Sequence, residues 1–286
     1  MDYTECYVNI PQQERNYSVY RIISRERLYE LFDKQKNTLL KLHKWEDPFE
    51  NFILRLKGQL PNGEVVEFGQ RHDFYGQCWT LRGNTDAMWR IYSTDKKSLR
   101  IKVRIRKLIE TLAPTAIGPV FVGKVRYLTT EGLLRWAKNV LRNAKSPDIN
   151  LLARTLLVKR TAFSHEQEVR LLYFDPREEQ PITFQYPVDP HTFIEEIVID
   201  PRLSLAEIDR FIEEIRVKTG FRGKIAQSDL YAPPRELVIK LGPAYSSLTR
   251  SSENVGHNGD MREITIQPGL NSQIILPPAS PRRIRS

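Results

Sequence analysis

The sequence predicts an α+β fold, in which helices pack on a mixed β-sheet. In some segments apolar residues alternate with charged ones, and in others they recur at helical spacing, so strands and helices are both expected. These segments follow one another irregularly, without a βαβ period of about 30 residues and without an internal repeat. The motifs GxGxxG and GxxxxGK[ST] do not occur, which argues against a Rossmann dinucleotide site and against a P-loop nucleotidase.

Length, composition and charge place the chain in a broad class. Its 286 residues, 40% hydrophobic and 28% charged, are compatible with one large globular domain. No apolar run is long enough to span a bilayer and the first residues do not resemble a signal peptide, so we expect a cytoplasmic protein that does not enter a membrane. Two cysteines and five histidines without ligand spacing indicate no metal site. The net charge of +9 raises the prospect of a polyanionic partner.

The first elements follow from caps and apolar spacing. Residues 17–23 are β-branched and aromatic and predict a strand. Ser24 is a good N-cap for a helix whose apolar face carries Leu28, Leu31 and Phe32. A strand-like segment and a turn at Asp47 and Pro48 come next. The Gly-rich and charged residues 57–72 predict a hairpin or an exposed loop.

The middle of the chain contains the most regular strand pattern. Residues 74–80 predict a buried aromatic strand, and a helix is expected to begin after Asn84 or Thr85. Between residues 99 and 106 apolar and basic residues then alternate strictly, which predicts a strand with one core face and one basic face. Four like charges on one face repel one another, so either a polyanion or acidic neighbours should relieve them. The candidate nucleic-acid-binding residues are Arg100, Lys102, Arg104 and Arg106.

The second half of the chain predicts a further set of strands and helices. We expect strands at residues 120–128, 181–186, 194–200, 224–228 and 236–240, and helices at 131–143, 149–160 and 204–218. We divide the chain into an N-terminal extension (1–16), one α+β domain (17–244) and a flexible basic tail (245–286) rich in Ser, Asn, Gly, Pro and Arg. The tail could add short strands or bind a protein partner.

Residues 164–172, SHEQEVRLL, place two glutamates directly before an apolar run. If this stretch is a strand, Glu166, Glu168 and Arg170 point to one side of the sheet. One interpretation is a solvated face, whose charges contribute little. The other is a carboxylate pair facing a cleft, as glycosyl-transfer chemistry requires.

Three other segments contain candidate site residues. Arg21 lies in an otherwise apolar strand, where its guanidinium needs a carboxylate or phosphate partner unless it faces outward. Thr80 ends the segment CWT, and a hydroxyl residue there is compatible with core packing or with a site. Trp89 and Tyr92 are spaced i, i+3 on the expected helix, which fits either core packing or a ligand platform.

Several of these segments together resemble a bacterial family known as domain of unknown function 2971. The resemblance lies in YRIIS, WEDPFEN, CWTLRGNTDAMWRIYS, KVRY, LLVKRTAFSHEQEVRLLY and IEEIVIDPRLSLAEIDRFIEEI with KIAQSDLY, over roughly residues 17–232. The family implies no settled activity.

A more distant resemblance, to ADP-ribosyltransferases of the Arg, Ser/Thr, Glu-x-Glu type, implies a mechanism. Such enzymes bind NAD in a cleft of a split α+β sheet without a Rossmann motif. The resemblance implies that Arg21, with Tyr20, Trp89 and Tyr92, contacts NAD, and that Thr80 supports the glutamate strand. It further implies that Glu168 stabilises the oxocarbenium ion, while Glu166 orients or deprotonates the acceptor.

Two residues depart from the ADP-ribosyltransferase pattern. Cys78 stands where the motif often has its first serine, and Arg170 is close enough in sequence to neutralise the glutamates.

The leading hypothesis is an ADP-ribosyltransferase-like enzyme with NAD as substrate and a macromolecular acceptor, nucleic acid rather than protein. A toxin or phage-defence role would fit that activity. The alternatives are a nucleic-acid-binding or regulatory module without catalysis, and a glycohydrolase that cleaves NAD or a nucleotide. Both enzyme hypotheses require Arg21, Thr80 and Glu168 to converge on one cleft.

Overall fold

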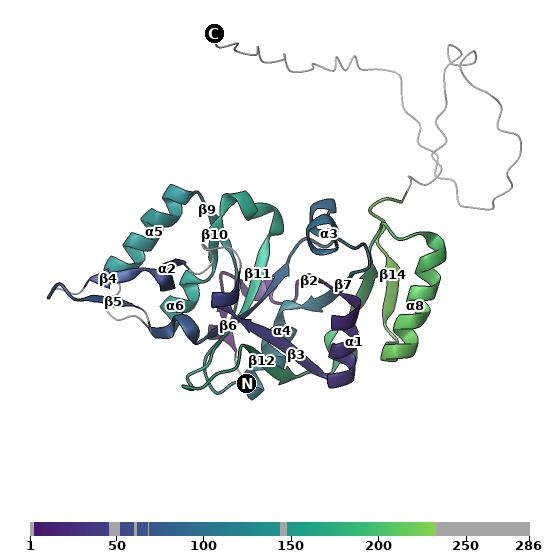
Figure 1. Cartoon of the computed structure of the whole chain (residues 1–286), viewed down its shortest axis with the longest axis horizontal. Helices are drawn as coiled ribbons and strands as arrows, with labels where there is room; N and C mark the ends of the chain where they lie inside the picture. The colour runs from purple at the N-terminus through teal and green to yellow at the C-terminus, as the bar shows by residue number, and fades with distance from the viewer. Residues whose placement is uncertain (1–2, 46–51, 60–61, 68, 144–147, 233–286) are drawn as a thin grey trace, which may run out of the picture. The chain divides into compact units, whose positions relative to one another are not determined.

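A computed structural model describes residues 3–45, 52–59, 62–67, 69–143 and 148–232, and all of these except Ala232 belong to one compact unit, Met1–Tyr231. Within them, ten strands form one sheet in the order β1-β8-β11-β6-β2-β7-β13-β14, and β3 links β12 to β6. The β1–β8 and β13–β14 pairs are parallel and the other pairs are antiparallel. The predicted α+β class with a mixed sheet is therefore confirmed (Figure 1).

The strands of this sheet are short to medium in length. Their bounds are β1 (Tyr7–Val8), β2 (Ser18–Ile23), β3 (Lys36–Lys41), β6 (Phe74–Thr80), β7 (Leu99–Arg104), β8 (Val120–Lys124), β11 (Glu168–Phe174), β12 (Thr183–Pro187), β13 (Glu196–Ile199) and β14 (Lys224–Gln227). Two further strand pairs lie outside the sheet, namely β4 (Lys57–Gln59) with β5 (Val65–Glu67), and β9 (Arg126–Leu128) with β10 (Val158–Arg160).

The helices pack on the sheet and at its two ends. Their bounds are α1 (Arg25–Lys34), α2 (Phe52–Arg55), α3 (Asp86–Tyr92), α4 (Ile105–Leu112), α5 (Thr130–Asn143), α6 (Ile149–Thr155), α7 (Pro190–Phe193) and α8 (Leu205–Thr219). In Figure 1, α2, α5 and α6 lie near the β4–β5 hairpin, and α8 lies beside β14 at the other end. Arg25 and Glu214 form a salt bridge of 3.1 Å that joins α1 to α8. Across the described residues, no helix combines the length and apolar character needed to cross a membrane.

The sheet is split beside β6. One part of β6 pairs with β3, where Leu40 is opposite Gly76, and its last residue, Thr80, pairs with Tyr20 of β2. Between these two pairings, residues 77–79 of β6 pair with neither β2 nor β3. The strands β2 and β3 therefore diverge from each other beside these three residues. A divergence within the sheet leaves room for side chains and ligands that a continuous ladder would close.

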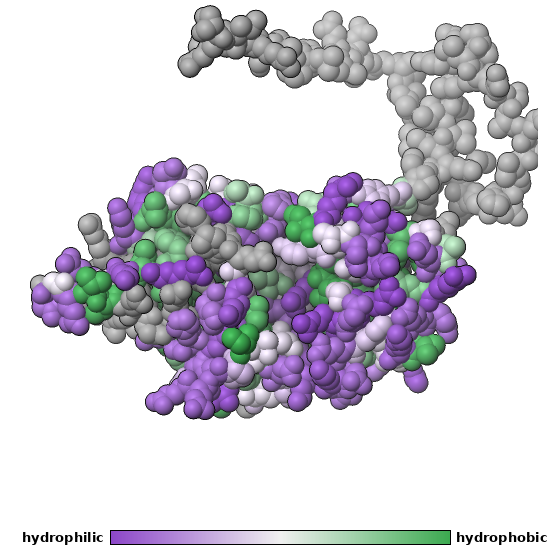
Figure 2. All heavy atoms as spheres, in the orientation of Figure 1, coloured by the Kyte–Doolittle hydropathy of each residue, from purple (hydrophilic) through white to green (hydrophobic). Residues whose placement is uncertain are grey.

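Two apolar clusters cover the two faces of the sheet. The larger contains Val169, Leu171 and Tyr173 of β11 together with α1, α4 and α8, and the smaller contains Leu172 with α6. Because side chains alternate along a strand, β11 contributes to both clusters and is buried on both faces. The surface over these layers is mostly hydrophilic on the face shown in Figure 2, as expected for a chain with this charge content.

Local sequence signals place several elements correctly. The Ser24 hydroxyl accepts a hydrogen bond from the Arg27 amide at 3.3 Å and caps α1, and Thr85 caps α3 in the same way. The expected hairpin in residues 57–72 is present as β4 and β5. The helix predicted at 204–218 is α8, which begins with a capping box of Ser204 and Glu207.

Three predicted elements were wrong in their extent. The basic strand ends at Arg104, because Ile105 and Arg106 already belong to α4, whose apolar residues recur at helical spacing. The helix predicted at 149–160 ends at Thr155, and β10 follows. The strand predicted from residue 164 begins at Glu168.

The domain boundaries drawn from composition stay predictions. The segment before residue 17 contributes β1 to the edge of the sheet through its pairing with β8. The proposed tail, 245–286, and the strand expected at 236–240 lie outside the described residues.

Candidate functional site

Three predicted site residues form one row across neighbouring strands. Thr80 of β6 is directly opposite Glu168 of β11 on one side and Tyr20 of β2 on the other. Directly opposed residues project from the same face of a sheet. Tyr20, Thr80 and Glu168 therefore lie side by side on one face. Thr80 and Glu168 are two of the three residues that were predicted to converge.

Glu166 also lies beside Glu168, but it does not belong to the strand as predicted. It ends a 3-10 helix, Thr161–Glu166, and Gln167 then adopts the left-handed conformation (φ 41°, ψ 58°) before β11 begins. A non-glycine residue in this conformation is strained. The Thr80 hydroxyl donates a hydrogen bond to the Glu166 carbonyl oxygen, and the Leu81 amide donates to the Gln167 carbonyl at 3.0 Å. These bonds fix the turn against the end of β6.

Both glutamates are buried in a cluster with two cations. Glu168 is 4% exposed and Glu166 is 7% exposed, so the solvated-face interpretation is wrong. Arg170 donates from Nε and Nη2 to the two Glu168 oxygens at 3.0 and 2.9 Å. Lys159 Nζ lies 2.7 Å from Glu166 Oε2 and 3.5 Å from Glu168 Oε2. Two carboxylates thus face two cations, which offsets the cost of burying all four charges.

Glu168 is held in its ionised form. Burial would raise the pKa of Glu168, but the charge and hydrogen bonds of Arg170, together with Lys159 and a hydrogen bond to Cys78, outweigh burial and lower the pKa below its ordinary value of 4.5. Arg170 is fully buried and also donates to the Leu156 carbonyl oxygen at 2.6 Å. The predicted neutralisation of the glutamates by Arg170 is confirmed for Glu168.

Two tyrosines complete the polar surroundings of the glutamates. The Tyr127 hydroxyl accepts a hydrogen bond from the Glu168 amide at 2.8 Å, and burial raises the pKa of Tyr127 to about 12. The Tyr92 hydroxyl lies 3.4 Å from Glu166 Oε1. Burial and the Glu166 charge both raise the pKa of Tyr92, so both tyrosines stay protonated and can donate hydrogen bonds at neutral pH.

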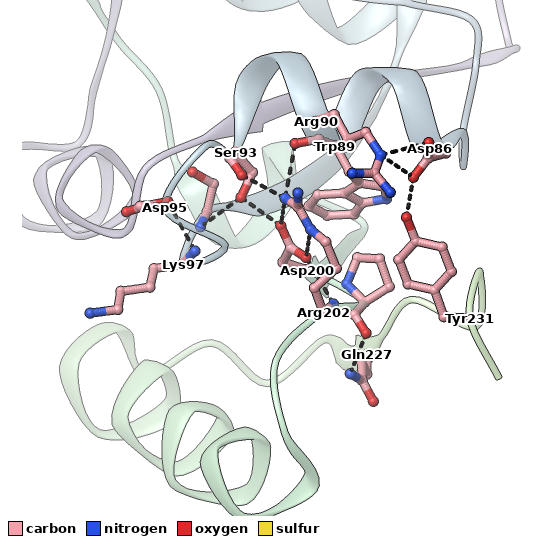
Figure 3. A network of polar contacts seen from close by, with 12 residues as sticks. Asp86, Trp89, Arg90, Ser93, Asp95, Lys97, Asp200, Arg202, Gln227 and Tyr231 are labelled. Atoms are coloured by element: carbon pink, nitrogen blue, oxygen red, sulfur yellow. Dashed lines mark hydrogen bonds and ion pairs between the residues drawn. The ribbon is translucent and has the colours of Figure 1, made fainter.

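A buried polar network anchors α3, the helix that brings Tyr92 to Glu166. Asp200, which is fully buried, accepts from the Ser93 hydroxyl at 2.6 Å and pairs with Arg202 at 2.6 Å (Figure 3). Arg202 also donates to the carbonyl oxygens of Trp89 and Ser93, which satisfies the C-terminal end of α3. The position of Tyr92 therefore depends on contacts with the turn after β13.

An open hollow adjoins the row of site residues. It has a volume of about 450 Å³, and its lining includes Ser18, Tyr20, Leu81, Arg104 and Lys124. Of the row, Tyr20 lines the hollow, whereas Thr80 and the two glutamates are not among its lining residues. Its volume is within the range of about 300–1,000 Å³ typical of small-molecule sites.

Arg21 does not join this site, and its predicted convergence with Thr80 and Glu168 is wrong. It follows Tyr20 on β2 and pairs with Ile101, so its side chain projects from the opposite face. There it lines a separate pocket together with Trp79 and Ile101. Alternation along the strand makes Tyr20, and not Arg21, the β2 residue beside Thr80.

Trp89 and Tyr92 have different surroundings despite their helical spacing. Trp89 is 1% exposed and its indole Nε1 donates to Asn84 Oδ1 at 3.2 Å, which makes it a core residue. Tyr92 is 48% exposed while its hydroxyl reaches Glu166. Of the two, only Tyr92 is placed to contact a ligand at the glutamates.

The predicted basic face is paired with acidic neighbours. Arg100 lies 3.2 Å from Glu196, and Lys102 and Arg104 lie 3.5 and 2.5 Å from Glu195. Arg106, on α4, pairs with Glu110 at 3.8 Å. We expected either a polyanion or acidic neighbours to relieve the repulsion between these four basic side chains, and the structure shows acidic neighbours.

Lys159 and Tyr127 were not predicted from the sequence. Lys159 lies in the apolar run LLVKR, and a lysine there was a signal for a buried partner.

Among the described residues, no group of three or more His, Cys, Asp or Glu side chains could hold a metal ion.

Comparisons with known proteins give distant structural matches. No protein-family model and no curated protein matches the chain, so membership of the domain of unknown function 2971 family stays a prediction. Solved structures of DarT from Thermus sp. 2.9 are similar. The complex with NAD+ has a TM-score of 0.35 and 16% identity, over 78% of this chain and 100% of DarT. The complex with ADP-ribosylated ssDNA has a TM-score of 0.35 and 15% identity, over 78% of this chain and 98% of DarT. A TM-score this low identifies no site residue.

Proposed function

We propose that the protein is an ADP-ribosyltransferase-like enzyme with NAD as its substrate. The hypothesis drawn from the sequence required Arg21 in the same cleft as Thr80 and Glu168, and the proposal replaces Arg21 with Tyr20. The observation that carries it is the row of Tyr20, Thr80 and Glu168 across β2, β6 and β11, with Glu166 beside it. This row and Glu166 supply an aromatic side chain beside an open hollow, a hydroxyl residue and a pair of buried carboxylates. These are the groups expected for a reaction that passes through a cationic sugar.

In the proposed reaction, the bond between the nicotinamide nitrogen and the ribose C1 breaks, and its electron pair leaves with neutral nicotinamide. The ionised Glu168 stabilises the positive charge that develops on the ribose. Each carboxylate oxygen has two lone-pair sites, so Glu168 can accept a ribose hydroxyl while it keeps Arg170. An acceptor oxygen or nitrogen then forms the new bond to C1 and loses its proton.

Glu166 and Tyr92 are the groups we assign to the acceptor. Glu166 Oε2 is taken by Lys159, whereas the contact of Oε1 with the Tyr92 hydroxyl is long, at 3.4 Å. Glu166 Oε1 is thus the atom suited to orient the acceptor and take its proton. Because both carboxylates are buried, access requires a side chain to move, and the exposed ring of Tyr92 is the one whose movement would uncover Glu166.

Nucleic acid is the acceptor to test first. The net charge of +9 favours association with a polyanion, and the single-stranded DNA present in one DarT complex is a suitable probe. A toxin or phage-defence role follows from such an activity only if the modification stops growth. A glycohydrolase differs from this proposal solely in using water as the acceptor.

The binding-module alternative has less support. Its four candidate phosphate contacts are each within 4 Å of a carboxylate, so binding a phosphate there would compete with an existing ion pair. It predicts affinity that falls steeply with salt and is unchanged by Glu168→Gln.

The test measures nicotinamide release from NAD by the purified protein, with and without single-stranded DNA. We expect Glu168→Gln and Tyr20→Leu to lower turnover by about 100-fold or more, with folding verified by circular dichroism. Arg90→Met is the matched control, because Arg90 is exposed on α3 and forms its salt bridge with Asp86 of the same helix.

Two results would contradict the proposal. One is the absence of NAD turnover by the wild type with DNA, protein or water as the acceptor. The other is full turnover by Glu168→Gln. If Arg21→Met lowers turnover as much as Tyr20→Leu, the assignment of the NAD site to the Tyr20 face is wrong.

A further inference from the structure

A second pocket lies on the other face of β2, where the sheet is split. It has a volume of about 220 Å³ and is lined by apolar side chains from three strands and α1, including Ile23, Leu31, Leu40 and Ile101. The ring of Trp79 adds an aromatic wall. A cavity of about 150 Å³ with apolar walls holds a benzene ring, so this pocket has room for one ring or a short aliphatic chain with a polar group attached.

Arg21 is the cation in this pocket, and its charge is not balanced. It is half-buried, and no hydrogen bond or ion pair joins its guanidinium to any residue in the part of the chain that the structure describes. Burial lowers the pKa of Arg21, against weaker opposing contributions from Cys78 and Tyr186. A guanidinium has five N–H donors, and those of Arg21 are available to a ligand in the pocket.

The polar atoms near Arg21 are already engaged with one another. Asn37 Nδ2 donates to the Tyr186 hydroxyl at 2.8 Å, and Gln77 Nε2 donates to Asn37 Oδ1 at 2.9 Å. Gln77 Oε1 accepts from Trp79 Nε1 at 2.9 Å. This network fills the gap where β6 pairs with neither β2 nor β3, and it uses the acceptors that Arg21 would otherwise take.

Charged residues at the pocket favour a negative ligand. Besides Arg21, the lining includes Arg27 and Lys36, against one carboxylate, Glu30. Glu30 is already paired at 2.7 Å with both Arg27 and Lys34. The pocket therefore combines a positive potential with apolar walls.

We propose that this pocket is a binding site for a small monocarboxylate with an apolar body. Its carboxylate would take a bidentate pair of hydrogen bonds from Arg21, a geometry that the planar guanidinium favours. The apolar walls favour a ligand with one negative charge, whereas a phosphomonoester brings about −1.5 to −2 into this largely apolar space. The ring or chain of the ligand lies between Trp79 and the aliphatic side chains.

The site is separate from the glutamates, because Arg21 and Thr80 project from opposite faces of the sheet. It does not rest on the proposed NAD chemistry.

The experiment uses benzoate as the probe, with the full-length protein, isothermal calorimetry and thermal unfolding. We expect benzoate to bind and to raise the Tm with increasing concentration. Benzyl alcohol, which has the ring without the charge, should bind at least about tenfold more weakly. Phenyl phosphate should also bind more weakly than benzoate.

Variants at Arg21 separate loss of the ligand from loss of the fold. Arg21→Met should weaken benzoate by about tenfold or more, while the Tm without ligand stays unchanged or rises, because an unbalanced charge has been removed from the pocket. Arg21→Lys should retain part of the affinity, since it keeps the charge and loses the fork. Arg90→Met should bind benzoate like the wild type.

Four results would overturn the proposal. The first is that the wild type does not bind benzoate at concentrations up to about 10 mM. The second is that Arg21→Met binds benzoate as tightly as the wild type. The others are that benzyl alcohol binds as tightly as benzoate, and that phenyl phosphate binds more tightly than benzoate. Displacement of benzoate by NAD would show that the pocket is part of an NAD site and would contradict a separate site. Each result is independent of whether the protein turns over NAD.

Discussion

Thr80 and Glu168 are directly opposed across β6 and β11, and the Thr80 hydroxyl also binds the backbone of Glu166. One residue thus meets both glutamates: the backbone of Thr80 lies opposite Glu168 in the sheet, and its side chain donates a hydrogen bond to the Glu166 carbonyl oxygen. The same hydroxyl accepts from the Arg82 amide at 2.9 Å. Any change at Thr80 should therefore affect the turn at residues 166–168 before it affects the rest of the sheet.

The first prediction concerns this hydroxyl. Thr80→Val keeps the shape of the side chain but leaves the Glu166 carbonyl oxygen and the Arg82 amide without their partner. We expect the free energy of unfolding to fall by about 1–3 kcal/mol, as measured by urea denaturation. Thr80→Ser is the control, because it keeps the hydroxyl, and it should cost less than Thr80→Val. Equal losses for the two variants would contradict the role of the hydroxyl.

The second prediction concerns the Lys159 and Glu166 pair. Lys159→Met leaves Glu166 and Glu168 buried with Arg170 as their remaining cation, so we expect a loss of about 3–5 kcal/mol of stability. Glu166→Gln should destabilise as well, and the double variant should lose less than the sum of the two by about 0.5–3 kcal/mol. A double-mutant cycle in urea measures this coupling. Additive losses would show that the 2.7 Å contact does not contribute to stability.

From the sequence alone, the strands and helices that carry the site were predicted better than the arrangement of the site's side chains. Aromatic content identified β6, alternation identified β7, and the caps at Ser24 and Thr85 marked two helix starts, because these signals are local. The predicted cleft failed at Arg21. Central strands are buried on both faces, so alternation shows which residues share a face without showing which face is open. Only the pairing of β2 with β6 selects Tyr20.

The turn between the two glutamates was also out of reach of sequence patterns. Glu-x-Glu in an alternating segment predicts a strand, whereas Gln167 adopts a positive φ. A glycine or asparagine at this position would have indicated a turn, because these residues adopt a positive φ readily. The turn is held by partners far along the chain, chiefly Thr80 and Leu81. Lys159 is likewise brought to Glu166 by tertiary structure, since it belongs to the preceding strand, β10.

The third prediction concerns pH. The pKa of Glu168 is lower in the folded protein than its ordinary value of 4.5. A carboxyl group of this kind stabilises the fold above its unfolded pKa, and this stabilisation is lost as the pH falls through the folded pKa. We expect Glu168→Gln to be less stable than the wild type at pH 7, and the difference to narrow below about pH 4.5.

Urea unfolding from pH 7 to pH 3 measures this narrowing. Glu213→Gln is the control, since Glu213 is exposed on α8, and it should follow the wild type at every pH. A constant difference between the wild type and Glu168→Gln would contradict the assignment of the lowered pKa to Glu168.

The last prediction concerns the anchor of α3. Arg202→Met leaves the fully buried Asp200 without its cation and removes the bonds to the Trp89 and Ser93 carbonyl oxygens. We expect a loss of about 3–5 kcal/mol of stability and faster amide hydrogen exchange in residues 86–93. Arg90→Met changes an exposed arginine of the same helix and should cost less than about 0.5 kcal/mol. Because α3 holds Tyr92 against Glu166, faster exchange in α3 with unchanged exchange in β11 would show that Tyr92 can move while Glu168 stays fixed. Equally faster exchange in β11 would mean that the two sides of the site open together, and Tyr92 could not then act as a separate cover for Glu166.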